Sequence, residues 1–417
     1  MRGRLFYGWI LVVALGLTTI VSYGTTQYLF GVLVVPIHQE LGWSRAAISG
    51  AYSTSIVLAG LLGFPVGRLA DRRGARGLMS LGSLLGAGCL FGLSQARELW
   101  QFYLLWAGGL GLAMALTLYP VTFIVVTNWF VRRRGTAMAL LTVLGGISSP
   151  IYIPVAGLLV ARAGWRETLV VMAFTQLLLA LPLHALVLRR HPEDVGLHPD
   201  GLPAPVTSAG PGAGLSLRES LRRPAFWLVT LAVGLSGMGV SVVHAHQVAY
   251  MISRGFDPVL AATVAGMVGL ASLPGRFLIN LLSDRLAPRQ LLALGTALQG
   301  AGIVVLALAA TPALLWAYVV VFGAAFGANA SLRASVMAEH FGRRAYGAVT
   351  ALQGIPVAVL AGLGPLLAGA LYDRLGGYSL ALWLTAAAFG IGGLVMLLTP
   401  RPPAGRVFAP EPAPAAA

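Results

Sequence analysis

Apolar residues fill long runs along almost the whole chain, and polar residues are confined to short breaks between these runs. Twelve of the runs hold enough apolar residues to cross a hydrocarbon core of about 30 Å as a helix. The pattern therefore predicts an all-α integral membrane protein with twelve transmembrane helices. The predicted spans are residues 7–33, 46–70, 77–94, 99–130, 136–161, 166–188, 224–252, 259–283, 290–310, 313–338, 346–372 and 377–399.

A single long polar segment, residues 190–223, divides these spans six from six. Its proline and glycine content is typical of a linker. We therefore predict four parts of the chain, which are an N-terminal six-helix bundle (1–190), a cytoplasmic linker (191–223), a C-terminal six-helix bundle (224–400) and a disordered Pro/Ala-rich tail (401–417).

The two predicted halves carry the same polar landmarks after corresponding spans. GRLADRRGAR (67–76) follows the second span and LLSDRLAPR (281–289) follows the eighth, and each has an Asp-Arg pair with a further arginine five residues after the Asp. WFVRRRGTA and HFGRRAYGA follow the fourth and tenth spans in the same way. Two six-helix halves related by a repeat are the plan of many secondary carriers.

Composition supports a membrane protein, because only 10% of residues are charged whereas soluble domains average about a quarter. The net charge of +15 does not indicate a nucleic-acid partner, since the arginines are spread between apolar runs. With the N-terminus inside, twenty of the 28 arginines lie on the inner side and six on the outer side. This asymmetry predicts that both termini are cytoplasmic.

Enzyme chemistry has no support in the sequence. Cys89 is the single cysteine, so neither a disulfide framework nor a cysteine metal site is expected. There is no HExxH spacing and no plausible nucleophile–base pair. We predict a protein that is not an enzyme and that needs no cofactor and no metal.

The candidate chemistry centres on Arg276, which lies within the eighth span. An ionised side chain at mid-membrane costs at least about 2.5–3.5 kcal/mol, and none of the 13 acidic residues lies in the middle of a predicted span. The substrate's own carboxylate, held by the guanidinium fork, would balance the charge. Ser272, Arg276 and Asn280 share one helix face at i, i+4 and i+8. The alternative is that Arg276 bends to the cytoplasmic rim or binds backbone carbonyls.

Several stretches together resemble the monocarboxylate transporter and oxalate–formate antiporter branch of the major facilitator superfamily. They cover nearly the whole chain and are LGWSRAAISGAYS (41–53), GRLADRRGAR (67–76), NWFVRRRGTAMA (128–139), AGWRET (163–168), PEDVGLHPDG (192–201), RRPAFWL (222–228), LPGRFLINLLSDR (273–285) and GPLLAGALYDRLGGY (364–378). The resemblance implies that Arg276 is the family's helix 8 arginine that binds the substrate carboxylate. It also implies a conformational latch in the loops, formed by Gly67, Asp71, Arg72, Gly74, Arg76, Asp284, Arg285 and Arg289.

Further residues are weighed as parts of the same site. His246 resembles the family's helix 7 histidine and is the candidate for proton coupling, and Tyr119 resembles a substrate-contacting tyrosine. Tyr28 could line the cavity, and for each of these residues ordinary packing within the bundle is the alternative. For His244 packing is the favoured reading. Arg333 lies close to the end of its span, so we expect it to reach toward the inner surface.

The predicted function is proton-coupled symport of a small monocarboxylate such as lactate or pyruvate by alternating access. Residues 346–372 contain no basic residue, whereas oxalate-carrying relatives place a lysine in helix 11, so a dicarboxylate would be poorly compensated. Exchange of organic anions of the oxalate–formate type stays open, and a drug-type exporter and a non-transporting sensor rank lower. The expected partners are a small carboxylate, protons and the lipid bilayer, in a multi-pass cell-membrane protein acting as a monomer.

Overall fold

The computed structural model describes residues 6–202, 214–283, 285–327, 329–342 and 344–401. Twelve helical segments in this part of the chain are long and apolar enough to cross a membrane, which confirms the predicted number of spans. The first half contains α1 (Tyr7–Tyr23), α2 (Phe30–Leu41), α3 (Arg45–Arg73), α4 (Ala75–Ser94), α5 (Leu99–Phe102), α6 (Gly111–Thr117), α7 (Tyr119–Trp129), α8 (Arg134–Gly146), α9 (Ser148–Ala163) and α10 (Trp165–Thr175). The second half contains α11 (Leu217–Leu221), α12 (Pro224–Ser253), α13 (Pro258–Ser283), α14 (Pro288–Ala307), α15 (Pro312–Phe326), α16 (Asn329–Phe341), α17 (Tyr346–Leu375) and α18 (Ser379–Leu398).

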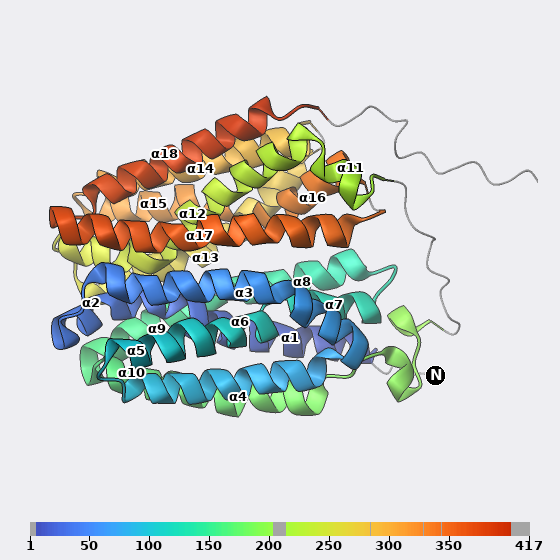
Figure 1. Cartoon of the computed structure of the whole chain (residues 1–417), viewed down its shortest axis with the longest axis horizontal. Coiled ribbons are helices and arrows are strands. Elements are labelled where there is room, and N and C mark those ends of the chain that lie inside the picture. The colour runs from blue at the N-terminus through green and yellow to red at the C-terminus, as the bar shows by residue number, and fades with distance from the viewer. Residues whose placement is uncertain (1–5, 203–213, 284, 328, 343, 402–417) are drawn as a thin grey trace, which may run out of the picture.

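Figure 1 shows helices α1–α10 in one layer and helices α11–α18 in a second layer beside it, with the long helices α3 and α17 facing each other. The N-terminus lies at one end of the molecule, and we call this the terminal end. The tip of α2 lies at the other end, which we call the opposite end. If both termini are cytoplasmic, as the arginine count predicts, the terminal end faces the cytoplasm. Most of the predicted tail, and residues 203–213 of the predicted linker, lie outside the described residues.

The first span is longer than predicted, because the helix continues through the polar residues His38, Gln39 and Glu40. It ends where Gly42 adopts a left-handed conformation (φ +67°) and its N–H bonds to the carbonyl of His38. A glycine takes this conformation without steric cost, which is why many helices end at one. The predicted span ended at residue 33, five residues before the first polar residue, His38, whereas the backbone places the end at the glycine.

Several helices are interrupted midway, and these interruptions surround the space between the two halves. A π-helical turn, Gly24–Tyr28, separates α1 from α2. Leu118 is extended (ψ −178°) and separates α6 from α7, and Ile147 joins α8 to α9 after two glycines. Irregular backbone at membrane depth is tolerated where it is buried in protein or lines a cavity. These breaks therefore mark where side chains can face a ligand.

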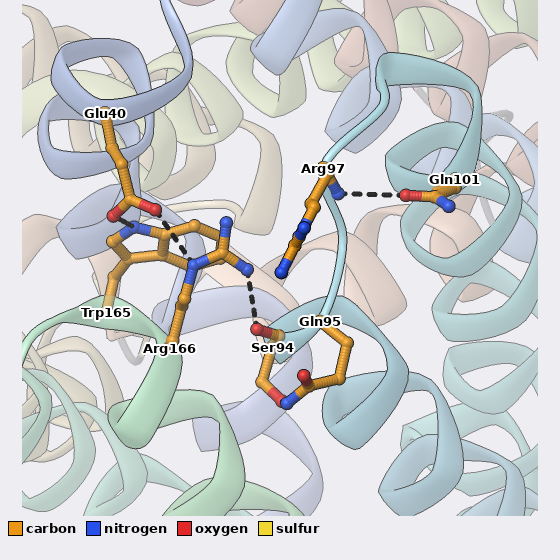
Figure 2. Close-up of polar contacts among 7 residues, drawn as sticks. All are labelled: Glu40, Ser94, Gln95, Arg97, Gln101, Trp165 and Arg166. Atoms are coloured by element: carbon orange, nitrogen blue, oxygen red, sulfur yellow. Dashed lines mark hydrogen bonds and ion pairs between the residues drawn. The ribbon is translucent and has the colours of Figure 1, made fainter.

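The opposite end of the first half is held by an ion-pair network, shown in Figure 2. Arg166 Nε lies 2.9 Å from the Glu40 carboxylate, and Trp165 Nε1 donates to the same carboxylate at 2.6 Å. Arg166 also donates to the carbonyl of Ser94 at 2.7 Å. The network joins the end of α2, the end of α4 and the start of α10. Because the pair is half-exposed, we assign it about 1 kcal/mol or less.

A second set of contacts at the opposite end joins the two halves. The Asp373 carboxylate of α17 accepts hydrogen bonds from the backbone N–H groups of Arg45 and Ala46, at 3.0 and 2.8 Å, at the first turn of α3. The Arg45 guanidinium donates to Tyr378 Oη at 2.7 Å and lies 3.7 Å from the centroid of the Tyr372 ring. In the described parts of the chain, the side-chain hydrogen bonds between the halves lie at this end or near the middle of the helices. The structure is thus a state closed at the opposite end.

Candidate substrate cavity

A cavity of about 330 Å³ lies between the two halves, at the level of the helix interruptions. This volume lies in the range of small-molecule sites, about 300–1,000 Å³. The first half contributes Tyr23, Gln27, Tyr28, Tyr119, Gly145 and Gly146, and the second half contributes Ala232, Val233, Ser236, Gly237, Val240, His244, Gly269, Ser272, Arg276, Leu292, Thr296, Phe326, Gly327, Asn329, Arg333, Val357 and Met396.

Arg276 lines this cavity, seven residues before the end of α13. A Cβ built on Gly146 would lie 3.4 Å from its Nη2 atom, so the guanidinium rests against the glycine pair that ends α8. Its Nε atom is buried and has no hydrogen-bond partner among the described residues. Among the described residues, the ion pair that is present joins Arg166 to Glu40 and does not involve Arg276. The arginine is therefore neither paired with a described carboxylate nor turned away from the cavity.

Aromatic rings form the wall beside Arg276 and continue from one half to the other. The rings of Tyr119 and Tyr23 lie 5.0 Å apart, and those of Tyr23 and Tyr28 lie 6.1 Å apart. Tyr28 meets the His244 ring edge-on at 5.1 Å, and His244 meets Phe326 at 6.0 Å. The Tyr119 hydroxyl lies against Gly145, one residue from the glycine that Arg276 contacts. Tyr28 and Tyr119 line the same cavity as Arg276, so an anion held there has phenol donors in the cavity wall.

Three predicted site residues line the cavity together with Arg276. They are Tyr28, Tyr119 and Ser272, whose hydroxyl donates to the carbonyl of Gly269 at 2.6 Å. The side chain of Asn280 lies outside the described residues. The structure thus brings together most of the predicted polar groups around one guanidinium.

His246 does not line the cavity; it is buried in the contact between the halves. Its Nε2 lies 2.9 Å from the Pro365 carbonyl and 3.3 Å from Ser49 Oγ, and its Nδ1 lies 3.1 Å from Tyr378 Oη. The histidine that lines the cavity is His244, for which the sequence favoured packing. Two residues along a helix turn the side chain by about 200°, so only one of the two can face the ligand space.

Arg333 also lines the cavity, which corrects the expectation that it reaches toward the membrane surface. Its Nε and Nη2 atoms both donate to Gln353 Oε1, at 3.3 and 2.9 Å. The helix continues to Phe341, three residues beyond the predicted span, so Arg333 lies deeper than expected. Gln353 is on a helix 20 residues away in sequence, and nothing in the local pattern of α16 indicates this partner.

Two further cavity residues, Asn329 and Tyr23, were not among the predicted site residues. Asn329 directly follows the break between α15 and α16, and its Nδ2 donates to Gln299 Oε1 at 2.8 Å and to Ser236 Oγ at 3.5 Å. Tyr23 precedes the π-helical turn of the first span. Both stand beside helix interruptions, so a search for polar residues next to mid-span breaks would have found them.

The predicted latch residues lie at the terminal end, where each half is held separately. Asp71, Arg72 and Arg76 are exposed, and the carbonyl of Asp71 accepts a hydrogen bond from Arg190 of the same half at 2.9 Å. Gly74 takes a positive φ of +83° where α3 meets α4, and Gly67 lies within α3. In the second half, Arg289 donates to the carbonyl of Thr399 at 2.6 Å, Arg285 is exposed and Asp284 lies outside the described residues. A latch between halves stays a prediction for another conformation.

Comparison with known proteins places this arrangement in a family. The sequence model of the Major Facilitator Superfamily matches residues 15–355 and, in a second match, 247–416. The chain belongs to the Major Facilitator Superfamily. It is an integral, multi-pass membrane protein, and its relatives and its fold are those of transporters rather than enzymes.

Individual relatives support the monocarboxylate transporter branch. Monocarboxylate transporter 13 of Bos taurus is 28% identical over 396 residues, which cover 94% of this chain and 89% of the relative. The MFS transporter asaE of Aspergillus flavus is 27% identical over 405 residues, which cover 94% of this chain and 86% of the relative.

Solved structures share the fold. A bacterial homolog of the human lysosomal transporter Spinster, inward-facing and occupied, has a TM-score of 0.70 at 16% identity over 95% of this chain and 97% of that one. A point mutant of the nucleoside transporter NupG has a TM-score of 0.73 at 15% identity over 94% and 99%.

Proposed function

We propose that this protein is a secondary transporter of small monocarboxylates, such as lactate or pyruvate, coupled to protons and working by alternating access. The observation that carries the proposal is the Arg276 guanidinium in a central cavity without a described carboxylate partner. A buried charge needs an opposite charge and hydrogen bonds to offset its desolvation. A carboxylate cargo supplies both, because its two oxygens match the guanidinium fork.

The surroundings of Arg276 suit an anion more than a cation or an apolar drug. Tyr28 and Tyr119 place phenol hydroxyls at the cavity wall, and no aspartate or glutamate lines the cavity among the described residues. A drug-type exporter of cationic compounds would need a buried acid there. The name of one relative, monocarboxylate transporter 13, points to the same substrate class.

For proton coupling we propose the histidines of α12 in two distinct roles. His244 lines the cavity, where its imidazole would exchange a proton with the bound carboxylate. His246 bridges Pro365, Ser49 and Tyr378 across the two halves, and Tyr378 also accepts the hydrogen bond from Arg45. The Pro365 carbonyl only accepts, so Nε2 of the neutral ring carries the hydrogen and Nδ1 accepts from the Tyr378 hydroxyl. Protonation makes both ring nitrogens donors, so Nδ1 no longer accepts from Tyr378. This histidine would thus bias the closed opposite end rather than hold substrate.

The test is uptake of labelled lactate, pyruvate and acetate into proteoliposomes, with and without an inward proton gradient. We expect all three to enter and the gradient to accelerate them. Arg276→Gln should lower uptake at limiting substrate by at least about 30-fold, because it leaves a buried carboxylate without its charge partner. Arg276→Lys keeps the positive charge but loses the two-pronged guanidinium geometry, so its uptake rate should lie between those of the wild-type protein and the Arg276→Gln variant.

Arg162→Gln is the matched control, since Arg162 is exposed and lies near the opposite end of its span. Each variant is checked for a monodisperse elution profile in detergent. Near-normal uptake by the Arg276→Gln variant would show that the carboxylate does not bind at Arg276. Uptake that is independent of the proton gradient but requires an anion inside the vesicle would indicate anion exchange instead of proton symport.

A further inference from the structure

The proposed monocarboxylate site uses one guanidinium, that of Arg276, and the central cavity holds a second one. Arg333 lines the cavity from α16, and its described hydrogen bonds go to one neutral atom, Gln353 Oε1. An amide oxygen orients the guanidinium but does not cancel its charge. Gln353 is fully buried, and its Nε2 has no hydrogen-bond partner among the described residues. Gln353 does not itself line the cavity, so it orients the Arg333 guanidinium from behind while the pair keeps a net positive charge.

Described carboxylates do not reach Arg333 from the protein. The nearest acid along α16 is Glu339, six residues later, which is about 9 Å along the axis and rotated by about 240°. The ion pair in the described chain joins Arg166 and Glu40 at the opposite end of the other half. A buried cation without a fixed partner is costly. As with Arg276, a ligand is the remaining source of negative charge.

The two arginines stand at similar depth in the same half. Arg276 lies seven residues before the end of α13, and Arg333 eight residues before the end of α16. At 1.5 Å per residue, these are about 10 and 12 Å from the terminal end of their helices. Apolar side chains line the same cavity, among them Val233, Leu292, Val357 and Met396. The cavity therefore presents two cations and an apolar wall.

We propose that Arg333, oriented by Gln353, is a second anion subsite, which binds the second carboxylate of an aliphatic dicarboxylate while Arg276 holds the first. This inference rests on the proposed function, because it takes Arg276 as the first carboxylate anchor. It widens the substrate class from monocarboxylates to dicarboxylates with a short apolar spacer. The lack of a basic residue in 346–372 had argued against dicarboxylates, but Arg333 supplies from α16 the charge that α17 lacks.

The test compares matched acids of four carbons, butyrate with one carboxylate and succinate with two. Each competes with labelled lactate for uptake into proteoliposomes, and the quantity measured is the ratio of the two inhibition constants. In the wild-type protein we expect succinate to compete at a lower concentration than butyrate. Arg333→Gln should raise the succinate-to-butyrate ratio about 10- to 100-fold, as the loss of a hydrogen bond to a charged group predicts. Arg333→Lys should raise the ratio less, and the control Arg162→Gln should leave it unchanged.

Thermal stabilisation of the detergent-purified proteins by succinate and by butyrate gives a second readout, which does not need transport. The inference is overturned if lactate is carried but succinate competes no better than butyrate in the wild-type protein. It is also overturned if Arg333→Gln weakens both acids by the same factor, since that pattern indicates a structural role. If neither lactate nor succinate is carried or bound, the proposed function fails as well, so the two failures are distinguishable.

Discussion

The contact between Asp373 and the first turn of α3 sets how firmly the opposite end is closed. Its carboxylate accepts two backbone hydrogen bonds, at 3.0 and 2.8 Å, from the other half of the molecule. Hydrogen bonds to a charged group contribute about 1.5–3 kcal/mol when buried, and the positive end of a helix adds about 0.3–1 kcal/mol. Asp373 is exposed, and water replaces these bonds when the halves separate. We therefore expect Asp373→Ala to destabilise the closed state by about 1–2 kcal/mol.

A loss of this size changes the ratio of closed to open molecules about 5- to 30-fold. Double electron–electron resonance between two spin labels measures the separation of the halves. The labels are placed at Arg97→Cys in the first half and Thr311→Cys in the second half, in a Cys89→Ser background. Both positions are exposed at the opposite end. The distribution should gain a longer distance in Asp373→Ala. Asp257 is the matched control, since its carboxylate accepts from Leu260 within its own helix. An unchanged distribution in Asp373→Ala, or an equal change in Asp257→Ala, would refute this reasoning.

Two further predictions concern a glycine of the cavity and a contact of the linker. Gly146→Leu should abolish transport although Arg276 is retained, because a Cβ there already meets Leu273 at 3.2 Å and Arg276 at 3.4 Å; Gly88→Leu, where a Cβ meets nothing within 4 Å, should transport normally in the same uptake assay. Burial alone would raise the pKa of Asp200, but hydrogen bonds from the backbone N–H groups of Arg132, Arg133 and Val131 hold this pKa below its ordinary value of 3.8. Because the folded-state pKa is the lower one, the stabilisation is complete above about pH 3.8 and is lost as the pH falls through the folded value. At neutral pH, Asp200→Ala should therefore speed hydrogen exchange at residues 131–133, and unchanged exchange would count against the contact.

The number and order of the spans could be predicted because a run of apolar residues is a local property of the chain. Helix ends were less predictable, since they depend on a glycine conformation such as that of Gly42. Arg276 could be picked out as a candidate site residue because recognising a charge in an apolar run needs no knowledge of tertiary structure, and the structure places it in the cavity wall. Its neighbours Tyr28, Tyr119 and Ser272 line the same cavity, as the sequence interpretation predicted.

The other site residues required knowledge of how the helices rotate and pack. His244 and His246 are two positions apart on α12, and only the packing of α3 and α17 decides that His246 faces Ser49 and Pro365. Arg333 was misplaced for a related reason. Its distance from the helix end allowed it to reach the surface, but Gln353 on α17 holds it in the cavity. Such contacts arise between helices and leave no periodic signal in either one.

Under the proposed function, the placement of charge in the cavity gives a physical reason why binding of the anion and movement of the two halves would be coupled. Both cavity arginines belong to the second half, whereas the phenols of Tyr23, Tyr28 and Tyr119 belong to the first half. An anion bound between them contacts both halves at once. Closing the terminal end around an empty cavity would bury two uncompensated guanidinium groups, which is costly at low dielectric. A bound carboxylate lowers that cost, so it favours the closed cavity by the difference in its affinity for the two states. On this argument an empty carrier crosses between states slowly, and the anion itself lowers the barrier that its transport must overcome.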